Sequence, residues 1–139
     1  MPKIYRVMQK MYEGPTIGNG PLDLGVRVPT DIQPDFAGNV SPGIGGMSVS
    51  PRLTALPPHR VPRRLHPLVP RAAGKDFHFV WSMGEGAFAA GTVALGLCLR
   101  PDPANDKHGF VEPVAVIAIA DYQEALAATR DEWQVDETG

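Results

Sequence analysis

Residues 45–66 form the most distinctive segment of this sequence and read Gly-Gly-Met-Ser-Val-Ser-Pro-Arg-Leu-Thr-Ala-Leu-Pro-Pro-His-Arg-Val-Pro-Arg-Arg-Leu-His. The segment begins with two glycines and continues through residues 47–50, whose alternation of apolar and polar side chains is typical of a short strand. It ends in a loop interrupted by prolines. Because proline lacks a backbone N–H and fixes φ, we expect no regular helix or central strand between residues 51 and 70.

Positive charge is concentrated in and around this segment. The stretch from residue 36 to residue 75 contains no carboxylate, whereas all 15 carboxylates lie elsewhere together with seven of the 13 lysines and arginines. The six cations of the stretch are Arg52, Arg60, Arg63, Arg64, Arg71 and Lys75. Two interpretations remain open: a solvated basic loop, or a site for an anion such as phosphate, since glycine, serine and arginine together form anion cradles.

The composition indicates one domain of short strands and loops. The 139 residues include 15 glycines and 15 prolines, which favour turns over a helical bundle. The single cysteine, Cys98, excludes an internal disulfide and a cysteine-based zinc site, and we expect it to be a small buried hydrophobe. The histidines lack metal-ligand spacing, so no metal site is expected.

We expect a soluble protein made in the cytosol that does not enter a membrane. The N-terminus has no apolar signal region, and no stretch approaches the roughly 18 uninterrupted apolar residues of a membrane-spanning helix. If the protein leaves the cell, the sequence predicts a route that reads no cleavable signal.

Regular structure is expected at both ends of the chain, with a long loop between. Glycine and proline pairs predict an ordered loop at residues 12–46, which would be either an active-site flap or an interface. A helix is expected to follow residue 120, with Asp121 as N-cap and Glu124 in the capping-box position. Its packing face comprises Tyr122, Leu126, Thr129 and Trp133, and residues 136–139 are expected to fray. Strands are expected at residues 3–8, 47–50, 77–81, 93–99 and 114–120.

Arg6 lies on the same face of the first expected strand as Ile4 and Met8. A guanidinium that shares a face with apolar side chains must sit at a pocket edge or find an anionic partner, since burying it without partners is costly. Arg6 is therefore a candidate binding residue, with an exposed arginine on an edge strand as the alternative.

Three pieces of the sequence, taken in chain order, resemble the Arg–Ser–Glu arrangement of the ADP-ribosyltransferase fold. They are Tyr5-Arg6 in the first strand, Gly-Gly-x-Ser-x-Ser at residues 45–50, and Glu112 before a late strand. The context Leu-Pro-Pro-His-Arg and His-Gly-Phe-Val-Glu-Pro adds similarity to small bacterial toxin domains of that fold, including type VI secretion effectors. The resemblance spans most of the chain through short motifs. It implies a single α+β domain over residues 1–139, with two small, mostly antiparallel sheets around a central cleft and few helices.

The resemblance also implies NAD as substrate and a role for each motif residue. Glu112 would hydrogen-bond a ribose hydroxyl and stabilise an oxocarbenium-like transition state. Arg6 would bind the pyrophosphate through its fork-shaped guanidinium, and Ser48 would fix the strand beside the nicotinamide or contact Glu112. These three are the candidate catalytic residues. The candidate NAD-binding residues are Tyr5, Arg6, Gly46, Ser48, Ser50, His59 and Arg60.

The sequence departs from the family pattern at two positions. Met47 stands where many members have Ser or Thr, and Phe110 stands where enzymes that modify arginine carry Gln or Glu. A protein-arginine acceptor is thus disfavoured, and the acceptor remains open.

Three functions fit these observations. The first is a toxin that transfers ADP-ribose from NAD or hydrolyses NAD in a target cell, together with an acidic immunity protein covering the basic loop at residues 52–71. The second is a non-catalytic module that uses this loop to bind nucleic acid or an acidic protein. The third is a structural component of a secretion or phage particle.

Overall fold

The computed structural model describes residues 1–138 and has an α+β fold with few helices and mostly antiparallel sheets, as expected. Strands are short, and the only α-helix in this described part lies near its C-terminal end. The elements are β1 (Ile4–Met11), β2 (Gly14–Pro15), β3 (Asn39–Val40), β4 (Met47–Val49), η1 (Leu53–Ala55), η2 (Arg63–Leu65), β5 (His78–Met83), β6 (Gly91–Ala94), β7 (Leu97–Pro101), β8 (Gly109–Pro113), β9 (Ile117–Ala118), α1 (Ile119–Ala127), η3 (Arg130–Glu132) and β10 (Gln134–Val135).

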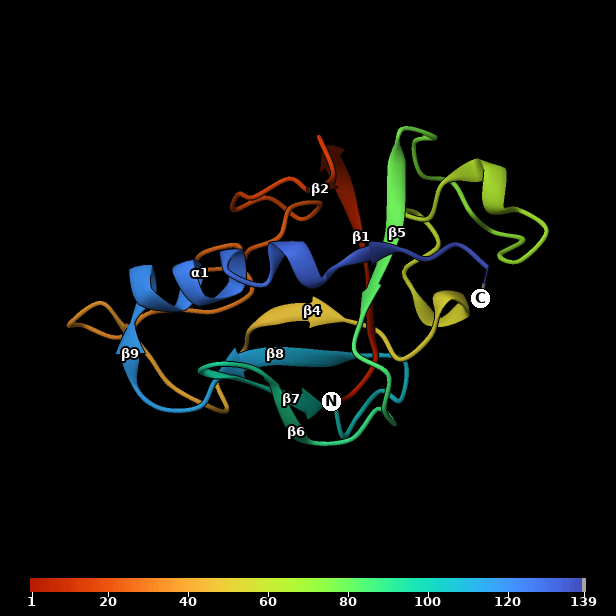
Figure 1. Ribbon diagram of the computed structural model, residues 1–139. Coiled ribbons are helices and arrows are strands. Elements are labelled where there is room, and N and C mark those ends of the chain that lie inside the picture. Colours follow the sequence, from red (N-terminus) through yellow and green to blue (C-terminus); the bar gives the residue numbers. More distant parts are fainter. Residues whose placement is uncertain (139) are drawn as a thin grey trace.

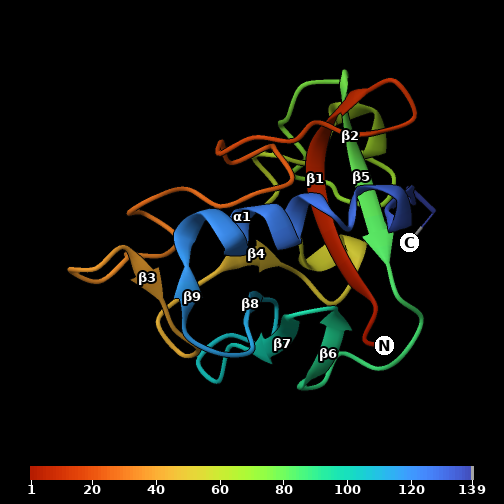
Figure 2. The same cartoon turned by 60° about the vertical axis from the view of Figure 1, so that its left-hand side comes forward.

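Two four-stranded sheets meet at the N-terminal part of β1. One sheet has the strand order β10-β5-β1-β2 and the other β4-β8-β7-β6, while β3 and β9 form a separate pair. The long strands of the first sheet run across those of the second (Figures 1 and 2). Tyr5 and Ser50 join the sheets, because each backbone N–H donates to the other residue's carbonyl at 2.9 Å. Residues far apart in the sequence thereby meet at one junction.

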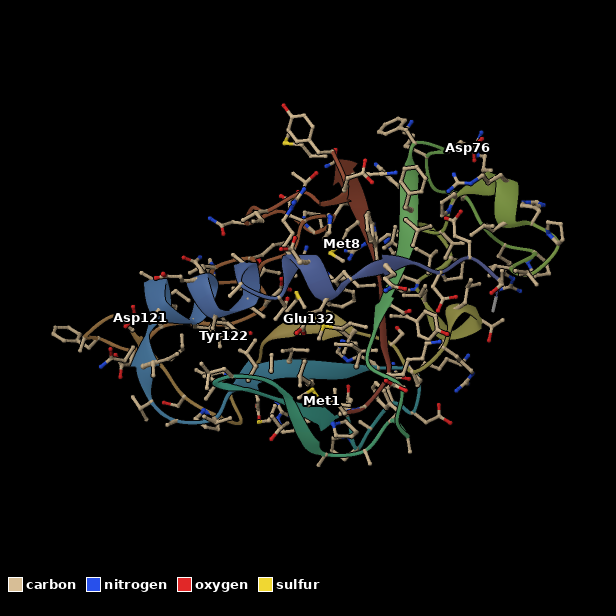
Figure 3. All side chains as sticks on the ribbon, viewed as in Figure 1. Met1, Met8, Asp76, Asp121, Tyr122 and Glu132 are labelled. Carbon is tan, nitrogen blue, oxygen red and sulfur yellow. The ribbon has the colours of Figure 1, made fainter. Side chains whose placement is uncertain are left out.

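Both faces of the β1–β5 pair are covered, so Ile4 through Met8 are all buried. On one face Ile4 and Met8 pack in a core that includes Trp81 of β5 and Tyr122 of α1. Met8 and Tyr122 accordingly lie inside the molecule in Figure 3, with Asp76 at its periphery. The other face is covered by the proline-rich loop, which contributes Leu53, Leu56, Val61, Val69 and Ala72. The basic loop therefore has a structural role, because its apolar residues cover a sheet.

Most strand predictions are confirmed with shifted ends, but two are wrong. Residues 93–99 form a hairpin of β6 and β7, because Gly96 adopts φ +77° at the turn and Leu95 is exposed. Residues 114–120 do not form one buried strand either. Strand β8 ends at Pro113, residues 114–116 are exposed, and only β9 precedes the helix. An apolar run cannot by itself distinguish these arrangements.

The helix begins three residues earlier than predicted, so Asp121 is not its N-cap. Ala118 is the N-cap, and the N–H of Ile119 donates to the carbonyl of Gly38 at 3.0 Å. A backbone carbonyl from the long loop thus replaces the side-chain cap, and Asp121 stands in the first turn, where a negative charge is favourable. The predicted packing face is confirmed only for Tyr122 and Leu126, because α1 ends at Ala127 and Thr129 and Trp133 lie beyond it. Its four residues, Tyr122, Leu126, Thr129 and Trp133, are all buried.

Two local predictions are wrong at the chain's end and at Cys98. Asp136 accepts a hydrogen bond from Ser82 at 2.7 Å, and Glu137 accepts one from Val80 N at 3.1 Å, so this part of the tail is held against β5. Gly139 lies outside the described residues. Cys98 is only half-buried, because it lies on the outer face of the second sheet, opposite Glu112. No helix within residues 1–138 is both long and apolar enough to span a membrane.

Candidate functional site

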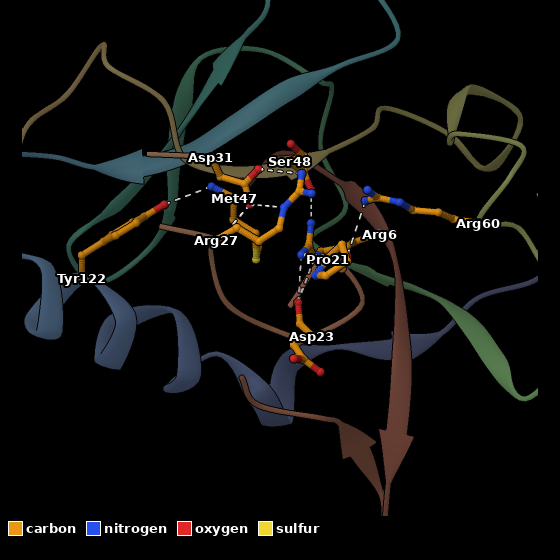
Figure 4. A network of polar contacts seen from close by, with 9 residues as sticks. All are labelled: Arg6, Pro21, Asp23, Arg27, Asp31, Met47, Ser48, Arg60 and Tyr122. Carbon is orange, nitrogen blue, oxygen red and sulfur yellow. Dashed lines mark hydrogen bonds and ion pairs between the residues drawn. The ribbon is translucent and has the colours of Figure 1, made fainter. Parts of the chain in front are cut away.

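Arg6 is the centre of the candidate site and is bound by backbone carbonyls. It is 4% exposed, and its guanidinium donates to Ser48 O at 2.8 Å, to Pro21 O at 3.2 Å, and twice to Asp23 O at 2.9 and 3.1 Å. Figure 4 shows these carbonyls converging on the side chain from the long loop and from β4. Arg6 is therefore not ion-paired, and its four side-chain hydrogen bonds all go to carbonyl oxygens.

Local contacts of the long loop present these carbonyls to Arg6. The carboxylate of Asp23 accepts a hydrogen bond from Gly20 N at 3.0 Å and closes a tight turn. The N–H of Leu24 donates to Thr16 O at 2.7 Å, and Gln9 N donates to Leu22 O at 2.8 Å, which ties the turn to β1. The turn at residues 20–23 is thereby fixed, with its backbone oxygens facing the guanidinium.

Two further arginines, Arg27 and Arg60, and the carboxylates of Asp31 and Asp23 lie close enough to Arg6 to affect its pKa. Arg27 donates to the Asp31 carboxylate at 2.9 and 3.1 Å, and Arg60 reaches Pro21 O at 3.5 Å. Burial lowers the pKa of Arg6 to about 10; Asp31 acts in the opposite direction, while Arg60 and Arg27 lower it further. Burial and the neighbouring Arg27 also lower the pKa of Arg60. At neutral pH the three guanidinium groups are charged and only Asp31 pairs with one of them, so the cluster keeps a surplus of positive charge.

This cluster borders a groove, here called the junction groove, which is lined by Arg6, Ser48, Ser50, Arg60, Lys107 and His108 among others. Beside Arg6 it is a narrow cavity of about 40 Å³. A wider part of about 250 Å³ adjoins it over η1 and Lys107, and the two parts share Ser50 and His108. The Nδ1 atom of His108 lies 3.2 Å from the Asp102 carboxylate, which orients the imidazole. The groove at the junction of the two sheets thus combines cationic and hydroxyl groups with apolar walls that include Val49 and Leu56.

Glu112 is buried on the outer face of the second sheet and does not line the junction groove. Its Oε2 accepts from Gly43 N at 2.8 Å and from Arg100 Nε at 2.9 Å. Ser48 is the register partner of Phe110, so Glu112 is its diagonal neighbour on the same face of the sheet. Both hydrogen bonds use Oε2, so Oε1 can accept a further donor.

The structure therefore brings together some of the predicted site residues. Ser48, Ser50 and Arg60 line the junction groove with Arg6, while Tyr5 contributes the backbone link between the sheets. Other candidates lie apart from that groove. Gly46 is beside the Tyr122 hydroxyl, and His59 is exposed in the basic loop on the far side of Arg60.

The aromatic residues of β5 and the segment before it do not form a stacking surface at the groove. Trp81 is buried in the core and donates through Nε1 to Met8 O at 3.1 Å. Phe79 packs partly against that core, and Phe77 is 65% exposed. Nowhere in residues 1–138 do three His, Cys, Asp or Glu side chains gather in a way that could hold a metal ion.

Comparison of the chain with protein-family models, curated proteins and solved structures finds no match.

Sequence reasoning missed Arg27 and Asp31. Their spacing of four residues was visible in the sequence, but such a pair in a turn-rich loop carries no signal of its own. Only the fold of the long loop places the pair beside Arg6 and Arg60 (Figure 4). Arg100, the partner of Glu112, was expected in an exposed loop, whereas it lies in β7 and reaches Glu112 through the pairing of β7 with β8.

Proposed function

We propose that the chain binds NAD in the junction groove and cleaves its nicotinamide–ribose bond, passing ADP-ribose to an acceptor or to water. The observation that carries this proposal is the cluster of Arg6, Arg27 and Arg60 beside Ser48, with a surplus of positive charge. A pyrophosphate carries two negative charges and several acceptor oxygens, which is the ligand chemistry that guanidinium groups bind well. The wider fold proposed with this function is that of an ADP-ribosyltransferase, with the cleft between the two sheets.

The burial of Arg6 supports a binding role. Taking a guanidinium out of water without an anionic partner is costly, and its carbonyl partners offset only part of that cost. An anion bound in the groove would supply the missing charge. Arg60, whose pKa is lowered by burial, would benefit in the same way.

Glu112 would act on the ribose once it is released from its present contacts. Breaking the glycosidic bond moves the bonding electron pair to nicotinamide and leaves positive charge on the ribose, and a nearby carboxylate stabilises that charge. Because Glu112 is buried beneath its contacts with Gly43 N and Arg100, the loop at residues 41–46 has to move aside before the carboxylate contacts substrate. A lysine, serine or carboxylate of the acceptor, or water, would then take the ADP-ribose.

The test is nicotinamide release from NAD by the purified protein. Glu112→Gln should lower kcat by about 100-fold, since it removes transition-state charge stabilisation, and leave KM nearly unchanged. Glu124→Gln, an equivalent change on the exposed face of α1, is the matched control and should have wild-type activity.

A second pair of variants tests the binding role of the cluster. Arg60→Gln should raise KM for NAD by about tenfold with little change in kcat, because it removes one charge-assisted contact. Arg71→Gln, an exposed arginine of the same loop, should change neither constant. No nicotinamide release with water or with cell lysate as acceptor would refute the proposed activity.

A toxin role follows from the same proposal. Expression of the chain alone should arrest bacterial growth, and Glu112→Gln should relieve the arrest. An acidic immunity protein is the proposed partner, because Arg52, Arg63 and Arg71 are exposed in the basic loop and make no ion pair with any described carboxylate.

These same exposed arginines favour a second candidate function, a non-catalytic module that binds nucleic acid or an acidic protein. Binding that weakens steeply with salt and is lost in a triple Arg52, Arg63 and Arg71 to Gln variant would support it. The two candidates separate cleanly, because this variant should retain nicotinamide release under the enzyme proposal.

A further inference from the structure

A second pocket lies on the other side of Arg60 from the junction groove. It has a volume of about 350 Å³. It is bordered by the turn at residues 20–23, by the basic loop with the residues that follow it, and by β5. We call it the His78 pocket; its polar lining residues are His59, Arg60, Lys75 and His78, and its apolar walls include Leu22 and Ala73. Its size lies within the range of small-molecule sites.

His78 is the feature of this pocket that the fold does not explain. The residue is 7% exposed, and its Nδ1 atom is buried with no hydrogen-bond partner in the described chain. A buried polar atom left unpartnered costs free energy, and nearly all such atoms in native proteins find a partner. Burial and the nearby Lys75 lower the pKa of His78, so the ring is neutral at pH 7.

The charge of the pocket matches a doubly negative ligand. None of the eight lining residues, all within residues 1–138, carries a carboxylate. Arg60 and Lys75 supply two positive charges and pair with no carboxylate in that part of the chain. Arg64 borders β5 through His78 O at 3.0 Å, but its charge is paired with Glu137 at 2.6 Å. Asp76 accepts a hydrogen bond from Arg64 N at 2.9 Å.

The hydrogen-bond donors and the apolar walls of the His78 pocket together favour a phosphate that carries an organic group. Two cations and two imidazoles exceed what a carboxylate with two oxygens and one charge can use, whereas a phosphate monoester has three terminal oxygens and close to two charges. The cavity is larger than a bare phosphate needs, and Leu22 and Ala73 offer apolar surface for an attached organic group.

We propose that the His78 pocket is a binding site for a small organic phosphomonoester, whose phosphate is held by Arg60, Lys75, His59 and His78. The site goes beyond the proposed NAD reaction. Within the described chain it shares Arg60 with the junction groove, while its other lining residues, Lys75 and His78 among them, belong to the His78 pocket and not to that groove.

Calorimetric titration of the full chain with adenosine 5′-monophosphate, ribose 5-phosphate and adenosine tests the proposal. Both phosphates should bind and adenosine should not, since the charge carries recognition. Lys75→Gln should weaken binding of both phosphates by about tenfold. Lys107→Gln, an exposed lysine that lines only the junction groove, is the matched control and should bind as the wild type does.

The His78 ring gives a readout that does not rely on affinity. Its NMR signals should shift on adding adenosine 5′-monophosphate and stay unchanged with adenosine.

Three results would overturn the proposal. They are adenosine binding as tightly as its monophosphate, equal effects of Lys75→Gln and Lys107→Gln on phosphate binding, and displacement of the monophosphate by NAD. Lys75-dependent phosphate binding without nicotinamide release would refute only the NAD activity. Nicotinamide release without such binding would refute only the His78 pocket.

Discussion

Arg6 and Glu112 are equally buried, yet the protein satisfies their charges in opposite ways. Arg6 is 4% exposed and donates to carbonyl oxygens, so its charge has no opposite partner in contact. Glu112 is 5% exposed and accepts from the guanidinium of Arg100, so its charge is compensated. Hydrogen-bond geometry is satisfied at both residues, but charge balance is achieved only at Glu112.

This difference shows that satisfying the hydrogen bonds of a buried charged group and compensating its charge are separate requirements. Carbonyl dipoles hold Arg6 in place and leave its charge to act on a ligand, whereas Arg100 holds Glu112 and cancels its charge. If both residues serve one reaction, Arg6 is ready in the free protein and Glu112 must first exchange its partners. Binding of the anion would then precede exposure of the carboxylate.

The largest effect on stability is expected from Arg6→Met. The substitution removes the side-chain donor from the carbonyls of Asp23 and Ser48 and leaves Pro21 O with only its longer contact to Arg60, and the loss should be about 3–5 kcal/mol of unfolding free energy. Urea unfolding followed by the fluorescence of the buried Trp81 and Trp133 measures it. Arg52→Met, an exposed arginine of the basic loop, should change stability by less than about 0.5 kcal/mol. Similar unfolding midpoints for the two variants would show that the carbonyl network contributes little.

The Arg100–Glu112 pair should show a smaller, coupled effect. Arg100→Met and Glu112→Gln should each cost about 1–2 kcal/mol, the Arg100 side chain being 32% exposed and partly screened. In the double variant the costs should not add, because no charge remains unpaired, and the coupling energy should be about 1 kcal/mol. Strictly additive losses in a double-mutant cycle would mean that charge compensation at Glu112 has no net value.

The sequence predicted the parts of the fold whose signals are local. Alternation identified β1, aromatic and β-branched residues identified β5, and spacing identified the buried face of α1. The prolines correctly excluded regular structure from the basic loop, where only the short turns η1 and η2 form. The strand at residues 93–99 was mispredicted for a local reason, because the turn at Gly96 divides one apolar run into two strands. The start of the helix was mispredicted because it depends on a distant contact, the carbonyl of Gly38.

The candidate site was predicted only in part, for the same reason. Arg6 could be identified because a cation on an apolar face requires an explanation, and Ser48 because its glycine-rich context is distinctive. The partners of Arg6 are backbone carbonyls of residues 21, 23 and 48, which have no signature in the side-chain sequence. Arg27 and Arg100 reach the site through loops and hairpins that only the folded chain defines. Charge balance, which distinguishes Arg6 from Glu112, is therefore a property of the tertiary structure.

The smallest effect on stability is expected from a substitution in the loop that covers Glu112. Gly43 has φ +87°, its N–H donates to Glu112, and a Cβ built there would contact nothing within 4 Å. Gly43→Ala should therefore cost about 1 kcal/mol, from the left-handed backbone alone. Because the loop can relieve this strain only by leaving Glu112, amide hydrogen exchange at position 43 should become faster.

Gly96→Ala provides the control, since Gly96 has φ +77°, equal space around it and a place in the β6–β7 turn. It should lose a similar amount of stability and leave exchange at position 43 unchanged. If both variants accelerate exchange at position 43 equally, the loop responds to global stability and does not act as a separate cover. The other outcome is that only Gly43→Ala accelerates exchange at position 43, while the amides near Arg6 stay protected from exchange. In that case the loop that covers Glu112 opens without disturbing Arg6, as the different partners of the two residues imply.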